Sequence, residues 1–137
     1  MSVGVTKCVF VIGEDLPAGL AANTAAVLAV TLGQRVDGIV GPDVLDQDDQ
    51  AHTGLTMVPL PILKAPREAL QALRQQASAY PEMLVVDVSE AAQRARTYDV
   101  YRQTIASQAA STISYLGIAL YGEKTAINRL TRDFSLL

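Results

Sequence analysis

The sequence predicts a single α/β domain over residues 1–137, with a small mixed β-sheet covered by helices on both faces. An apolar run at residues 8–12 ends at Gly13 and leads into an Ala-rich stretch, residues 18–32, of helical composition. A buried strand followed directly by a buried helix is the opening unit of an α/β layer structure. Apolar and helical segments then alternate down the chain, and 137 residues suit one hydrophobic core.

Charge and cysteine content narrow the expected partners and compartment. The formal net charge of −3 argues against a surface built to neutralise phosphates, so we expect no nucleic-acid partner. The single cysteine, Cys8, cannot form an intrachain disulfide, which fits a reducing cytosol. The first six residues lack a signal-peptide pattern, and no unbroken apolar run reaches the roughly 20 residues of a membrane span. We therefore expect a cytoplasmic protein without a membrane partner.

The first helix and the segment after it have recognisable boundary signals. Asp15 is placed to be the N-cap of a helix that begins near Pro17, and Gly33 is a typical stop. Residues 35–45 are rich in β formers but are broken by glycines and by Pro42. This segment therefore predicts a short strand or an edge ribbon.

The rest of the chain predicts three further strands and three helices, in an overall order β–α–β–β–α–β–α–β–α. The strand at residues 55–64 contains two prolines, which place it toward a sheet edge. The other expected elements are a helix from Pro66 to about residue 79, a strand at 83–88 that ends near Asp87, a helical stretch from Ser89 onward, a strand at 114–121 and a short helix at about 123–131.

Four pieces of the sequence, taken in order, form a wider pattern. They are the opening strand with Asp15–Leu16 and the helix that carries Asn23, the strand end Lys64–Ala65–Pro66, the apolar strand that ends in Asp87, and Leu116–Gly117–Ile118 followed by Gly122 and a terminal Leu136–Leu137. This pattern resembles the type 2 peptidyl-tRNA hydrolases of archaea and eukaryotes. It covers most of the chain, with insertions at residues 36–54 and 89–111. The resemblance implies their fold.

Three shorter motifs point to a narrower group. They are N-x-A-A-V-L-A at residues 23–29, P-x-P-I-L at 59–63 and L-G-I-A-L-Y-G at 116–122. With these motifs the chain looks like a bacterial domain-of-unknown-function family that shares the hydrolase fold. None of the three motifs is diagnostic of a chemical reaction.

The sequence departs from the hydrolases at the positions that carry their chemistry. The resemblance implies a His on the first helix and a Gly- and Lys-rich loop before it, but this chain has Ala26 and a loop, residues 17–20, without Lys. Of the family's polar set only Asp87 is present, and Asn23 stands where Gln is usual. Without the lysines, binding of a tRNA backbone loses its electrostatic source. The resemblance therefore carries over the fold and not the hydrolysis of peptidyl-tRNA.

The polar stretch at residues 46–54 is the first candidate site. Asp46 and Asp48 lie near His52, the only histidine of the chain. Such a set is suited to binding a divalent cation or to acid–base chemistry near neutral pH. The spacing lacks the Gly and the distal Glu of a calcium loop, and we predict no metal or cofactor. The alternative is a solvated hairpin or Ω-loop whose polar side chains satisfy backbone groups.

Asp87 is the second candidate, because sites in α/β sheets gather outside the carboxyl ends of strands. Its alternative role is to cap the helix that follows. Asn23 lies on an otherwise apolar helix and either contacts a ligand above the sheet or bonds a neighbouring loop. Lys64 and Tyr121, each just past a strand core, are candidates for an anion, or else surface side chains that snorkel.

Three functional hypotheses follow. The first is a domain that binds a small molecule or peptide-like ligand in a pocket where Asn23, Asp87 and the 46–52 loop converge, with Asp15 among the contacts and with Asp87 and His52 as the catalytic candidates. The second is a diverged ester or amide hydrolase with a polar partner beside Asp87. The third is a non-catalytic interaction protein. Arginines and tyrosines at residues 93–108 favour a helix face for a partner, and we expect a homodimer.

Overall fold

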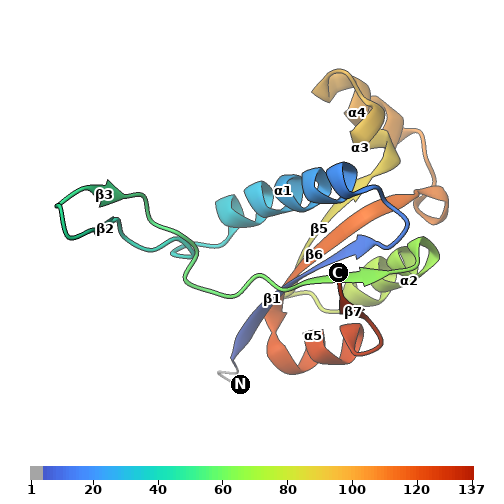
Figure 1. Cartoon of the computed structure of the whole chain (residues 1–137). Coiled ribbons are helices and arrows are strands. Elements are labelled where there is room, and N and C mark those ends of the chain that lie inside the picture. The colour runs from blue at the N-terminus through green and yellow to red at the C-terminus, as the bar shows by residue number, and fades with distance from the viewer. Residues whose placement is uncertain (1–4) are drawn as a thin grey trace.

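The computed structural model describes residues 5–137, which form one mixed sheet flanked by helices, with a hairpin that projects from the body (Figure 1). The N-terminal segment in which we expect no signal peptide lies mostly outside this range. The elements are β1 (Thr6–Gly13), α1 (Ala18–Arg35), β2 (Val44–Leu45), β3 (Ala51–His52), β4 (Ile62–Ala65), α2 (Arg67–Ala77), β5 (Leu84–Ser89), α3 (Glu90–Arg94), α4 (Tyr98–Ala106), the 3₁₀ turn η1 (Ala110–Thr112), β6 (Tyr115–Glu123), α5 (Lys124–Thr131) and β7 (Ser135–Leu136).

The main sheet has the strand order β5-β6-β1-β4-β7. The central strand β1 is antiparallel to β6, with Cys8 opposite Tyr121, and parallel to β4, with Ile12 opposite Lys64. The predicted mixed sheet is therefore confirmed. One placement differs from the prediction, because β7 covers β4 and makes it an inner strand. The apolar strand β5 forms the opposite edge. The prolines precede Ile62, so they do not interrupt the ladder of β4.

Helices cover both faces of the sheet, as the alternation of side chains along β1 requires. Phe10 and Ile12 face α1 and form one core with Leu28, whereas Val9 and Val11 face the other side. That second core is completed by side chains from α2 and α5. Both cores are mainly aliphatic, which agrees with the low aromatic content of the sequence.

The ends of α1 differ from the prediction. The cap residue is Pro17 and no side chain caps the helix, so Asp15 is not the N-cap. The helix continues through Gly33 to Arg35, and the backbone N–H of Val36 donates to the carbonyl oxygen of Leu32. The turn that redirects the chain is at Gly38, whose φ of 73° lies in the left-handed region that glycine adopts without strain.

Residues 40–57 form the projecting hairpin, which we call the arm. Its strands β2 and β3 pair antiparallel, and Val40 pairs with Thr56 closer to the body. The predicted polar loop forms its tip, where Asp46 Oδ1 accepts hydrogen bonds from the backbone N–H groups of Asp48 and Gln50. Of the two structures that the sequence allowed for this stretch, the chain adopts the hairpin.

The helical stretch after β5 is divided into α3 and α4. Thr97 caps α4 by accepting a hydrogen bond from the backbone N–H of Val100, and the chain between the two helices is not helical. Both helices lie beyond the β5 edge of the sheet, and neither contains a fully buried residue (Figure 1). The inserted segment therefore adds walls beside the sheet and contributes little to its core. Within residues 5–137 no helix is both long enough and apolar enough to cross a bilayer.

Candidate functional site at the sheet edge

Asp87 lies on the edge strand β5, opposite Ile118 of β6. Alternation along β5 directs Val86 and Val88 toward α1, so the Asp87 side chain is directed to the other face. There its Oδ2 accepts a hydrogen bond from Nε of Arg74 on α2, at 3.0 Å. The carboxylate is 24% exposed and the Arg74 side chain 36% exposed. Asp87 therefore belongs to a half-buried ion pair and does not cap α3.

This ion pair lies in a groove of about 580 Å³ between α2, β5 and the segment from α4 to Tyr115, which we call the β5 groove. Apolar and aromatic side chains alternate in it with amides and hydroxyls. Its residues are Gln71, Arg74, Gln75, Ser78, Asp87, Tyr101, Ile105, Ala110, Ser111, Ile113 and Tyr115. The volume and the mixed lining are typical of a site for a small molecule.

The two tyrosines of the β5 groove have altered acidity. Burial raises the pKa of the Tyr101 phenol, and the negative charge of Asp87 raises it further. The pKa of Tyr115 is raised by the same two causes, in the same order, against a smaller lowering effect of Arg74. Both phenols therefore stay protonated at neutral pH, and each has an O–H that is able to donate a hydrogen bond. The groove presents donors, one carboxylate and one guanidinium.

A second cavity, of about 340 Å³, lies on the other side of α4 and is lined by Ser89, Glu90, Arg94, Ser114 and neighbours. The hydroxyl oxygen of Ser89 is buried and has no hydrogen-bond partner among the described residues. Buried hydroxyls without partners are uncommon in proteins. The pairing of β5 with β6 shifts register between Val88 and Ser89. Ser89 therefore does not continue the regular alternation of side chains along β5.

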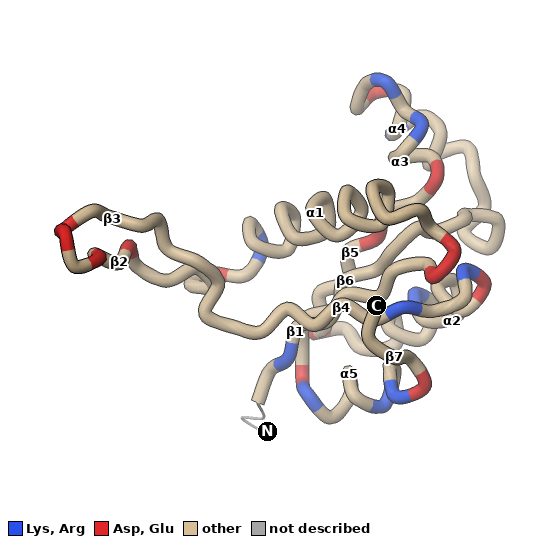
Figure 2. The backbone as a smooth tube through the Cα atoms, in the orientation of Figure 1, with Lys and Arg blue, Asp and Glu red and all other residues tan. Residues whose placement is uncertain are grey.

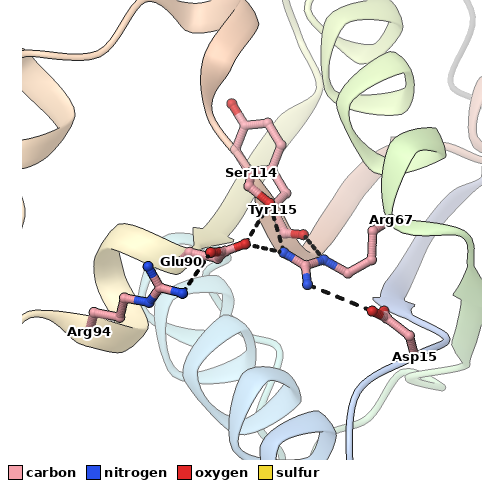
Figure 3. A network of polar contacts seen from close by, with 6 residues as sticks. All are labelled: Asp15, Arg67, Glu90, Arg94, Ser114 and Tyr115. Carbon is pink, nitrogen blue, oxygen red and sulfur yellow. Dashed lines mark hydrogen bonds and ion pairs between the residues drawn. The ribbon is translucent and has the colours of Figure 1, made fainter.

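Arg67 ties the walls of these two cavities together (Figure 3). Its Nη2 donates to Glu90 Oε2 and to Ser114 Oγ, both at 2.7 Å, and its Nε donates to the Tyr115 carbonyl oxygen at 3.0 Å. Its Nη1 lies 3.8 Å from Asp15 Oδ2. The network joins the start of α2, the start of α3, β6 and the loop before α1. It holds the inserted segment at a set position beside the sheet.

The network also accounts for the charge state of Glu90. The hydrogen bond from Ser114 and then that from Arg67 lower the pKa of its carboxyl group, with smaller contributions from the charges of Arg67 and Arg94. Arg94 Nη2 lies 3.2 Å from Glu90 Oε1. Glu90 therefore remains ionised well into the acidic range.

The arm holds the other predicted catalytic residue. His52 Nε2 lies 2.8 Å from Asp46 Oδ2, and this contact, followed by the backbone N–H groups of Gln50 and Asp48, lowers the pKa of Asp46. The cavities that Asp87 lines do not include these residues. Among residues 5–137 no group of three His, Cys, Asp or Glu side chains is placed to hold a metal ion.

The remaining predicted contacts are dispersed over the surface. Asn23 is exposed on α1, Lys64 is exposed on β4, and Asp15 belongs to the Arg67 network. The Tyr121 hydroxyl donates to Thr6 Oγ1 at 3.2 Å. The shared pocket that the first hypothesis requires is thus not formed, because the arm extends away from β5 and these side chains lie on separate elements.

The partners of Asp87 were missing from the prediction. Arg74 follows Leu73, which is buried, so Arg74 emerges beside the inner stripe of α2 and reaches the sheet edge. Tyr101 was noted in the sequence only as a possible contact for a protein partner. These side chains reach Asp87 only through the way in which α2 packs against β5 and β5 pairs with β6. No local sequence motif encodes that arrangement.

These features define a small mixed α/β domain with a groove of ligand size at its β5 edge. The chain belongs to the family described as "Protein of unknown function (DUF2000)", which matches it over residues 6–137. The predicted membership of a domain-of-unknown-function family is confirmed. No curated protein matches the chain.

A solved structure shares this architecture. It is that of a protein of unknown function, Atu0240, from Agrobacterium tumefaciens strain C58, with a TM-score of 0.87 and 20% sequence identity. The similarity covers 96% of this chain and 97% of the other. At this level of identity it establishes the fold alone.

Proposed function

We propose that the β5 groove binds a short peptide or another small molecule that carries both a positive and a negative group. The observation that supports this is the ion pair between Arg74 Nε and Asp87 Oδ2, which lie 3.0 Å apart. The two side chains are 36% and 24% exposed and line a groove of about 580 Å³. A guanidinium has five N–H donors, of which Asp87 takes the one at Nε. Further donors of Arg74 are thus available to a carboxylate, and Asp87 retains lone pairs for an ammonium or amide N–H.

The rest of the lining fits the same class of ligand. Tyr101, Ile105 and Ile113 provide an apolar wall for a side chain, while the protonated phenols and the amide groups of the groove suit a peptide unit. The charges of Arg74 and Asp87 cancel, so a ligand with only one charge gains less than one that addresses both. This balance favours a zwitterion over a simple anion.

The first prediction concerns binding. Titration calorimetry of the purified chain with a set of di- and tripeptides is expected to find a ligand whose affinity falls about tenfold or more in Asp87→Asn and in Arg74→Gln, because each variant removes one charge-assisted contact. Amide chemical shifts of α2, β5 and α4 are expected to change on binding.

Two matched variants act as controls. Asp99→Asn neutralises an exposed aspartate of α4 that pairs with Arg102, and His52→Ala changes the arm. Neither is expected to weaken binding at the groove. Circular dichroism must show all four variants folded. Affinity that is unchanged in both Asp87→Asn and Arg74→Gln contradicts the proposal.

The alternative proposal is that the groove hydrolyses a different ester or amide, as a diverged relative of the type 2 peptidyl-tRNA hydrolases. The observation that favours it is a polar partner, Arg74, within hydrogen-bond distance of Asp87 in a cleft. Release of free acid from peptidyl ester analogues, abolished by Asp87→Asn, would support this alternative. Binding without turnover would leave the first proposal standing.

The same resemblance supports a finer assignment of the fold. We propose a type 2 peptidyl-tRNA hydrolase-like arrangement, because the four matched sequence pieces fall on β1–α1, β4–α2, β5 and β6–α5.

A cytoplasmic location is likewise a proposal, supported by the lone cysteine, which is buried. Fractionation of cells that produce the chain tests the location.

A further inference from the structure

The arm exposes apolar side chains that the body does not cover. They are Val40, Val44, Leu45, Leu55 and Met57, and Leu55 is 79% exposed. Only four residues of the arm belong to its two strands, and a two-stranded hairpin by itself is marginally stable in water. A cluster of exposed apolar residues on such an extension marks an interaction surface.

A receiving surface lies on the body between α1 and the α3–α4 segment. It is a groove of about 490 Å³, which we call the α1 groove. Apolar side chains of α1, β5 and α3 line it together with Thr31, Asp87 and Thr97, and Arg96 and Tyr98 border it. Val27 and Tyr98, both in its lining, are 44% and 76% exposed. Residues 18–34 of α1 include no charged side chain, and of the two α1 residues in the groove only Thr31 is polar.

The charges of the two surfaces are complementary. The arm contains four aspartates and no Lys or Arg, although the net charge of the whole chain is only −3, so the rest of the chain carries no net negative charge. Arg94, Arg96 and Arg102 are exposed on or beside α3 and α4. Arg94 pairs with Glu90 and Arg102 with Asp99, so residues 90–106, with three arginines and two carboxylates, have a net charge of +1. Figure 2 shows the acidic residues at the tip of the arm and basic residues on the α3–α4 segment.

A chain cannot join these two surfaces within itself. The arm leaves the body at the end of α1, whereas α3 and α4 lie near the start of α1, and the arm extends away from them (Figure 1). A second copy of the chain supplies both surfaces in reciprocal positions. A two-fold axis then makes both contacts at once, which is how the commonest homodimers are built.

We propose that two copies of this chain exchange arms, each arm packing its apolar side chains into the α1 groove of the other copy, with its acidic tip beside the arginines of the α3–α4 segment. The α1 groove opens on the opposite face of the sheet from the β5 groove, although Asp87 and Tyr101 line both, and the interface is tested with variants of Leu55 and Val27, which lie outside the β5 groove. The interface therefore stands or falls separately from the proposed binding function.

The second prediction is the outcome of a mixing experiment, followed by size-exclusion chromatography with light scattering. The unaltered chain is expected to be a dimer, and Leu55→Asp on the arm or Val27→Asp in the α1 groove is expected to give a monomer. A mixture of the two variants is expected to recover a heterodimer, because the intact arm of one still fits the intact groove of the other. Leu137→Asp, which changes an exposed apolar residue outside both surfaces, is the control and is expected to stay dimeric.

Each other outcome overturns the proposal. A monomeric unaltered chain excludes the exchange. Dimers that survive Val27→Asp indicate arm-to-arm contact, and dimers that survive Leu55→Asp indicate contact between α1 helices. Two monomeric variants that fail to associate, while thermal unfolding shows both of them folded, exclude reciprocal docking.

Discussion

Gly117 lies where α1 packs closely on the sheet. A Cβ at this position would lie 2.7 Å from Thr24 Cγ2 and 2.9 Å from Ile12 Cδ1. Thr24 is itself buried, and its hydroxyl is satisfied within the helix by the Leu20 carbonyl oxygen. The glycine of the L-G-I motif at residues 116–118 thus has a packing reason, since only glycine lets α1 approach β6 this closely.

The third prediction compares two glycines by equilibrium denaturation. Gly117→Ala is expected to lower the free energy of unfolding by about 1–3 kcal/mol, because the added methyl group overpacks a filled core. Gly19→Ala is the matched control, since its Cβ meets nothing within 4 Å on the surface of α1. It is expected to raise stability by up to about 1 kcal/mol. Equal effects of the two substitutions would contradict this account of Gly117.

The inserted segment from α3 to η1 is the element that builds both cavities, and polar contacts rather than apolar burial hold it. Arg67 and Glu90 connect it to α2 and β6, and the amide of Gln71 donates to carbonyl oxygens of Ala110 and Ser111. None of the residues in α3, α4 or η1 is fully buried. Segments with little apolar burial open more readily than the core.

The fourth prediction tests the Glu90 contact across pH. The pKa of Glu90 is lowered from 4.5, chiefly by the hydrogen bond from Ser114 and then by Arg67, so its contribution to stability is present above that ordinary value and is lost as the pH falls through the lowered one. Glu90→Gln is expected to cost about 1 kcal/mol at neutral pH, a value discounted for partial exposure.

The measurement is urea denaturation of the variant and the unaltered chain at several pH values. The difference between them is expected to shrink in acid, where both side chains are neutral. Glu82→Gln, in the exposed turn before β5, is the control and is expected to show little difference at any pH. A difference that is constant down to strongly acidic pH would exclude the ionised form of Glu90 as its source.

The whole molecule consists of a body with two cores and an arm that carries much of the negative charge. The grooves on the two faces of the β5 edge both include Asp87 in their lining, yet they serve different proposals. The charge is unevenly distributed, because the arm has four aspartates and no Lys or Arg, whereas acidic and basic side chains are nearly balanced over the rest of the chain (Figure 2).

The fifth prediction uses Cys8 to report on the stability of the whole body. Cys8 lies in the central strand β1, and burial raises the pKa of its thiol to about 11. The native thiol is therefore both covered and protonated, and alkylation requires the sheet to open. We expect labelling by iodoacetamide at neutral pH to be slow and to accelerate with urea in step with unfolding measured by circular dichroism. Rapid labelling of the folded chain would contradict the burial of Cys8.

Part of the candidate site could be predicted from the sequence. Asp87 is predictable because it ends a short apolar strand, and sites in α/β folds gather there. Its ion pair with Arg74 was not predictable, since it depends on how α2 lies across β5. The Asp46–His52 contact follows from local spacing, but the direction in which the arm leaves the body does not, and this direction separates His52 from Asp87.

The alternation of strands and helices, the mixed α/β class and the family are properties that local sequence patterns determined. These patterns suffice because side-chain periodicity within an element reports which of its faces is buried. The tertiary structure alone decided that β4 is internal, that β5 is an edge, that Arg74 meets Asp87 and that the arm projects. Each of these depends on which surfaces, distant in sequence, pair and in what register, and no single segment contains that information.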